Sequence, residues 1–152
     1  MGWAEIGFGT VLGFALSEVK GFLRRKRRVK GLWQALQAEV AVCGEYSQIF
    51  LRDKISAPSY RIPTLCYGAA LPQLLADAGI EYADVRALTL FYAQADSFNR
   101  GLDQAELARN DPDRLEVEYQ RCRLKAEKLV PSEDASASFY KNAMDVLSAK
   151  VK

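Results

Sequence analysis

The first proline of this 152-residue chain is Pro58, so no proline interrupts the sequence from Trp3 to Arg52. Within that stretch an uncharged run, a dense group of cations and an amphipathic pattern follow one another. Because a helix rises about 1.5 Å per residue, one unbroken helix over these residues would be about 75 Å long. The sequence therefore predicts a long first helix that links two parts of the protein mechanically.

The N-terminal apolar segment predicts membrane association. Eleven residues from Ile6 to Leu16 carry no charge, which is fewer than the roughly 20 that cross a bilayer. Extending the segment to residues 3–23 gives sufficient length if Glu18 and Lys20 lie near the membrane boundary. We therefore expect a membrane-anchoring helix over residues 1–23. A spanning helix is favoured over an interfacial amphipathic helix and over an ordinary buried helix.

A basic cluster follows the apolar segment directly. Residues 1–30 hold seven Lys and Arg against two Glu, whereas residues 31–152 hold fourteen against seventeen acids. Such a local excess of cations is typical of contact with anionic lipid on the cytoplasmic side of a membrane. Nucleic acid is the alternative partner, but no side chain between these cations could stack on bases or read them. The juxtamembrane cluster over residues 24–30 consists of Arg24, Arg25, Lys26, Arg27, Arg28 and Lys30.

Small residues recur at every fourth position of the apolar segment. This pattern lets two helix backbones approach closely in lipid, so we expect a homo-oligomer packed through this face. The alternative is that glycine is simply common in membrane helices. In a pore-forming assembly, Glu5 and Glu18 would face the interface or a water-filled path. The helix-packing face consists of Gly9, Gly13, Ser17 and Gly21.

Residues 31–152 predict a helical cytoplasmic domain. Apolar residues at spacings of three and four predict helices over about 29–52, 64–79, 81–109 and 111–129, and a last one from Ser132 onward. Thr64 and Asp111 are the expected N-caps of two of them, and Pro72 is expected to kink or split its helix. No segment alternates as a strand does. The expected fold class is all-α, with the first helix continuing into an antiparallel bundle of four or five helices.

No residue pattern predicts a catalytic, cofactor-binding or metal site. The chain has no histidine, and its three cysteines are widely separated. These features argue against the common catalytic triads, histidine-ligated zinc and a disulfide framework. A solvated helix face explains the polar side chains of the middle helix better than a cation site does. Those side chains are Asp96, Asn99, Arg100 and Asp103.

The remaining candidate is the irregular loop around Tyr60 and Arg61, which we expect to be exposed to a protein partner. The order of parts resembles small single-pass bacterial membrane proteins with a basic collar and a helical cytoplasmic domain. We interpret the chain as a non-enzymatic protein of the inner membrane, with its N-terminus outside and its C-terminal domain in the cytoplasm. Its bundle would oligomerise or bind partners. The alternatives are a pore-forming or membrane-perturbing effector, and a soluble adaptor or nucleic-acid-associated subunit whose first helix is buried in a larger assembly.

Overall fold

The computed structural model describes residues 3–53, 58–77, 80–131 and 138–152, with side chains from residue 18 onward. Over these residues the chain forms five α-helices and a short 3-10 turn, with no strand. The prediction of an all-α helical bundle is confirmed. The elements are α1 (Trp3–Asp53), α2 (Leu65–Asp77), α3 (Tyr82–Leu107), α4 (Pro112–Ala126), the turn η1 (Glu127–Leu129) and α5 (Phe139–Val151).

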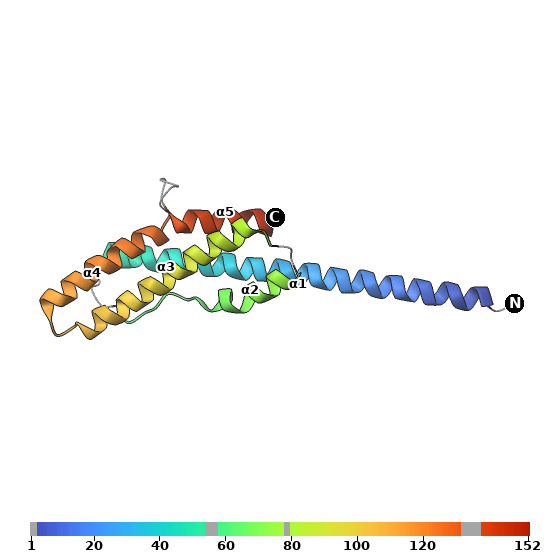
Figure 1. The fold of residues 1–152 in the computed structure, drawn as a ribbon, viewed down its shortest axis with the longest axis horizontal. Coiled ribbons are helices and arrows are strands. Elements are labelled where there is room, and N and C mark those ends of the chain that lie inside the picture. Colours follow the sequence, from blue (N-terminus) through green and yellow to red (C-terminus); the bar gives the residue numbers. More distant parts are fainter. Residues whose placement is uncertain (1–2, 54–57, 78–79, 132–137) are drawn as a thin grey trace.

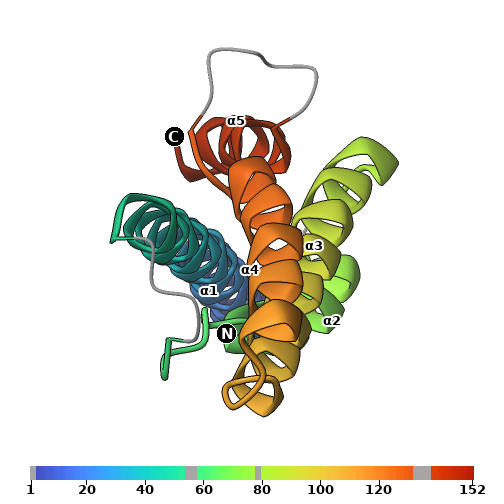
Figure 2. The same cartoon turned by 90° about the vertical axis from the view of Figure 1, so that its left-hand side faces the viewer.

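The second half of α1 belongs to the bundle, while its first half extends away from it alone (Figure 1). Within the bundle, α1 packs against α2 and α5, and α3 packs against α4 and α5 (Figure 2). Val29 packs on the core and Trp33 is buried, so the bundle begins near these residues. We call residues 3–28 of α1 the arm. At the helical rise of about 1.5 Å per residue the arm is about 39 Å long.

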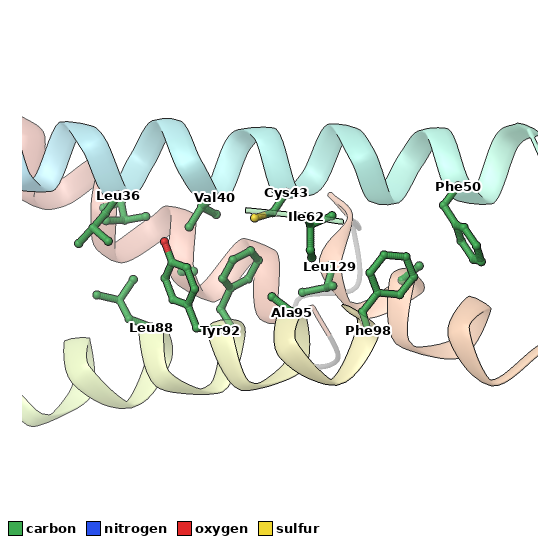
Figure 3. Close-up of a cluster of buried hydrophobic side chains, with 14 of the residues drawn as sticks. Leu36, Val40, Cys43, Phe50, Ile62, Leu88, Tyr92, Ala95, Phe98 and Leu129 are labelled. Carbon is green, nitrogen blue, oxygen red and sulfur yellow. The ribbon is translucent and has the colours of Figure 1, made fainter. Parts of the chain in front are cut away.

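The core forms where the apolar face of α1 meets that of α3 (Figure 3). The ring of Phe50 meets the ring of Phe98 edge-on, with the centroids 5.1 Å apart. The buried residues of α1 recur at three- and four-residue spacings, which places them on one side of the helix. Burying each large apolar side chain stabilises the fold by about 1.5–3 kcal/mol. Figure 3 shows Leu36, Val40 and Cys43 of α1 opposite Leu88, Tyr92 and Ala95 of α3.

Glycine permits a close contact between α1 and α5. A Cβ atom added at Gly44 would lie 2.5 Å from a carbon of the Tyr140 ring. By contrast, a Cβ atom added at Gly31 would meet nothing within 4 Å. The approach of α5 to α1 therefore depends on the missing side chain at Gly44.

The predicted cap of α4 is confirmed. The side chain of Asp111 accepts a hydrogen bond from the backbone of Arg114, and Pro112 occupies the first turn. Proline suits this position because the first backbone amides of a helix have no partner within it. Pro72, in contrast, lies inside α2 and does not split that helix.

A serine marks the start of the last described helix. Ser138 caps α5 by accepting a hydrogen bond from the backbone of Lys141, and the first helical residue is Phe139. The Ser138 hydroxyl also donates to the carbonyl of Val130, which ties the start of α5 to the end of η1. The predicted start at Ser132 lies outside the described residues.

The prediction of a membrane-spanning first helix is not borne out. Over the part of the chain that the structure describes, no helix is both long and apolar enough to cross a membrane. The physical reason lies in the charges, because the apolar run from Ile6 to Leu16 is followed after Ser17 by Glu18, Lys20 and the basic cluster. The side chains of residues 1–17, which make up most of the predicted anchoring segment, lie outside the described residues.

Candidate functional site

The arm presents cations and large apolar side chains to solvent together. All six members of the basic cluster are exposed, as is Glu18 at the start of the described side chains. Between them, Val19 is 55% exposed, Phe22 66% and Leu23 48%. An exposed helix with this composition is typical of segments that bind an anionic surface through charge and apolar contact together.

One cation of the basic cluster also holds the arm to the bundle. The Nε atom of Arg25 lies 3.2 Å from a carboxylate oxygen of Asp77, the last residue of α2. The same guanidinium donates a hydrogen bond of 3.3 Å to the carbonyl oxygen of Ala76. A cation is favoured at this position because the C-terminal end of a helix carries partial negative charge. We call the contact between Arg25 and the end of α2 the arm–α2 junction.

A groove of about 340 Å³ lies at this junction. Phe22 and Val29 supply its apolar lining, and Arg25 and Lys26 supply positive charge. The carboxylate of Asp77 is the one acid among these lining residues. The groove therefore combines an apolar wall with a net positive charge.

The predicted helix-packing face lies mainly outside the described side chains. Gly9, Gly13 and Ser17 belong to the helical arm, but their side-chain positions, like that of Glu5, lie outside the described residues. Gly21 is described, and a Cβ atom added there would meet nothing within 4 Å. No other part of the described chain therefore covers the packing face at Gly21. Self-association through this face stays a prediction.

The predicted partner loop is tied down within the bundle. The Arg61 guanidinium lies 2.7 Å from the carboxylate of Asp103 and 2.8 Å from that of Glu106, both on α3. The Tyr60 ring packs on the ring of Tyr46, with the centroids 5.3 Å apart, and burial raises the pKa of the Tyr60 hydroxyl. Neither side chain is fully exposed. Their contacts explain both residues as parts of the fold.

The polar side chains of α3 serve the same loop. The Asn99 side chain accepts a hydrogen bond from the amide of Ile62 and donates one to the carbonyl of Ile62, each 2.9 Å long. Asp103 pairs with Arg61, whereas Asp96 and Arg100 are exposed. The four residues singled out in the sequence therefore do not converge on one site. Two of them hold the loop between α1 and α2 against α3.

A buried carboxylate that the sequence analysis missed organises the centre of the bundle. Glu39 of α1 is only 6% exposed. One of its oxygens accepts a hydrogen bond of 2.9 Å from the backbone amide of Cys66, in the first turn of α2. The other accepts a hydrogen bond of 2.7 Å from the Tyr92 hydroxyl. The carboxylate thus caps α2 from a neighbouring helix, where the positive end of the helix dipole favours it.

The electrostatics of this centre suppress ionisation of its neighbours. Burial, together with the Glu39 carboxylate, raises the pKa of the Cys43 thiol to about 12 and raises that of the Tyr92 hydroxyl strongly. The Cys43 sulfur donates to the carbonyl of Pro63 at 3.1 Å. Since the thiolate is the reactive form of cysteine, Cys43 is a structural thiol at neutral pH. The one available sequence signal was a lone glutamate on the apolar face that includes Leu36 and Val40.

Metal-binding chemistry has no obvious location in the described structure. Across residues 18–53, 58–77, 80–131 and 138–152, no three His, Cys, Asp or Glu residues come together as potential metal ligands. The carboxylates of Asp103 and Glu106 pair with Arg61, and that of Glu39 accepts hydrogen bonds within the bundle. The exposed arm and its junction with α2 are among the features that the contacts of the bundle leave unexplained.

Comparison with known proteins adds no family or fold relationship. No protein-family model, no curated protein and no solved structure matches the chain.

Proposed function

We propose that this chain is a non-enzymatic helical protein whose arm docks on the anionic cytoplasmic face of the inner membrane, leaving the bundle to bind a protein partner. The observation that supports this most directly is the exposure of the whole basic cluster beside Val19, Phe22 and Leu23, on a segment that projects from the bundle. Membrane contact would give both kinds of side chain a partner at once.

The energetics favour a lipid surface. Each Lys or Arg near an anionic membrane contributes about 1 kcal/mol, and an apolar side chain that leaves water adds about 1.5–3 kcal/mol when it is fully buried. Two arms packed side by side in water would instead bring two clusters of like charge together. Nucleic acid would satisfy the charge but not the apolar side chains, since the cluster itself holds no aromatic residue.

Co-sedimentation with lipid vesicles tests the proposal. The full chain should bind vesicles that contain phosphatidylglycerol and should bind pure phosphatidylcholine vesicles much more weakly. Replacing Arg24, Arg27 and Arg28 by Gln should weaken binding about a hundredfold, because about 1 kcal/mol is lost per cation. None of these three arginines takes part in the arm–α2 junction, so the substitutions should not change the fold.

A matched control separates local from overall charge. Replacing Arg86, Arg109 and Arg114 by Gln removes the same charge from exposed positions on and around α3 and α4. This variant should bind nearly as well as the unaltered chain. Equal losses in the two triple variants, or equal binding to neutral vesicles, would refute docking through the arm. Tighter binding to duplex DNA than to anionic vesicles would favour a nucleic-acid partner instead.

Self-association belongs to the same proposal and has a separate test. Replacing Gly9 and Gly13 by Ile should abolish crosslinked oligomers in membranes if the small-residue face packs helices together. Neither result of this test affects the electrostatic docking of the basic cluster.

A further inference from the structure

The geometry points to a binding site for one anionic phospholipid in the groove at the arm–α2 junction. Arg25 and Lys26 would hold the phosphate of the headgroup, and Phe22 and Val29 would contact the glycerol and the first acyl carbons. This inference rests on the proposed membrane docking and names a specific lipid contact within it.

The size and lining of the groove fit such a ligand. Its volume of about 340 Å³ lies at the lower end of the range typical of small-molecule sites, about 300–1,000 Å³. Phe22 is 66% exposed, so much of its ring is available to an apolar partner. Arg25 is 51% exposed and Lys26 is exposed, so both cations can reach an anion. A ligand with a charged head beside an apolar chain satisfies both halves of the lining.

Charge complementarity selects an anion. Arg25 and Lys26 outnumber Asp77, the one acid that lines the groove, and the rest of the basic cluster adds further positive potential. The carboxylate of Asp77 already accepts from Arg25, so an incoming phosphate would compete with it for the same guanidinium. Arginine suits this exchange because its planar donor set fits either a carboxylate or a phosphate.

The apolar wall selects a lipid over a free phosphate. Inorganic phosphate or a bare headgroup would leave the exposed faces of Phe22 and Val29 in water. A phospholipid covers them, and covering most of an aromatic ring is worth roughly a tenfold gain in affinity or more. The groove should therefore bind a phosphate that carries an acyl chain more tightly than it binds the headgroup alone.

A soluble lipid separates this site from general adhesion to a membrane. The probe is dihexanoyl phosphatidylglycerol below its micelle-forming concentration, titrated into the full chain and followed by calorimetry and NMR. Saturable binding of one lipid per chain is expected, with shifted signals from residues 22–29 and 77. Glycerol 1-phosphate and dihexanoyl phosphatidylcholine should each bind at least about tenfold more weakly.

Matched variants locate the lipid in the groove. Phe22→Ala should weaken binding of the soluble lipid about tenfold. Leu23→Ala alters the neighbouring exposed residue, which does not line the groove, and should leave binding unchanged. Asp77→Asn should strengthen binding more than Glu18→Gln does, although both remove one negative charge near the cluster. Equal effects within either pair would overturn the assignment to this groove.

The remaining outcomes distinguish this inference from the proposed function. Vesicle binding without saturable binding of the soluble lipid would overturn the groove and leave membrane docking intact. No binding to anionic vesicles would overturn both. A lipid-free dimer, measured by light scattering and converted to a monomer by Phe22→Ala, would assign the groove to a second copy of the chain and refute a lipid site.

Discussion

Replacing Asn99 by Ala should destabilise the protein more than removing the charged Arg61, although Arg61 makes the more conspicuous contacts. Asn99→Ala deletes two hydrogen bonds of 2.9 Å to the backbone of Ile62, a residue whose exposure is only 2%. Each lost bond costs about 1 kcal/mol, and each backbone group left without a partner away from water raises that cost toward 1–3 kcal/mol. We therefore expect a loss of about 2–4 kcal/mol in the free energy of unfolding.

Arg61→Ala should cost less because the two carboxylates that it pairs with are open to solvent, although its guanidinium also donates to the backbone carbonyls of Pro58 and Tyr60. The side chains of Asp103 and Glu106 are 58% and 57% exposed, and ion pairs at such positions contribute about 0–1 kcal/mol each. Urea denaturation followed by circular dichroism measures both variants, and an unchanged dependence on urea concentration confirms that the same transition is compared. A larger loss for Arg61→Ala than for Asn99→Ala would refute this account of the loop.

Three further perturbations probe the bundle. Gly44→Ala should lower the free energy of unfolding by about 1–2 kcal/mol because the new methyl group would collide with the Tyr140 ring. Gly31→Ala meets no neighbour and should raise the free energy of unfolding by about 0.5–1 kcal/mol, since alanine favours the helix. Equal melting temperatures for the two variants would contradict the close contact at Gly44. Tyr92→Phe leaves the buried Glu39 carboxylate without one donor and should cost about 1.5–3 kcal/mol in urea denaturation, and a loss below about 0.5 kcal/mol would refute that role. Because burial raises the pKa of Cys43 from 9.0 to about 12, its contribution is intact below pH 9 and lost as pH rises toward 12. Cys43→Ala should flatten the fall of the urea midpoint between pH 8 and 11, and an unchanged slope would disprove the effect.

The helices follow from the sequence where their causes are local. The three- and four-residue spacing of apolar residues in α1 and α3, and the Asp111 cap of α4, depend on neighbours along the chain. The cap of α5 is less local, because Ser138 both caps the helix and donates a hydrogen bond to Val130 at the end of η1. The predicted start at Ser132 lies outside the described residues.

The polar contacts could not be predicted because their partners are distant in sequence. Glu39 receives its hydrogen bonds from groups 27 and 53 residues away. Arg61 meets its carboxylates across 42 and 45 residues. No local sequence pattern indicates contacts between residues so far apart. Loop composition therefore predicted that Arg61 is exposed, whereas the structure shows it paired with two carboxylates of α3.

Hydropathy and charge predicted the composition of the arm but not its tertiary contacts. The apolar segment and the basic cluster were evident from the sequence, and the exposure of the cluster is now described. The junction of Arg25 with the end of α2 was not predictable, since it joins residues that are 51 positions apart or more. Where the arm meets the end of α2, part of the basic cluster lines a groove together with apolar side chains.

The most direct measurement of the central claim is the distribution of the full chain between membrane and soluble fractions of cells. The account predicts that the unaltered chain sediments with membranes and that the variant with Arg24, Arg27 and Arg28 replaced by Gln shifts to the soluble fraction. The variant with Arg86, Arg109 and Arg114 replaced should stay with the membranes. The same distribution for the unaltered chain and the arm variant, at equal expression, would contradict docking through the basic cluster.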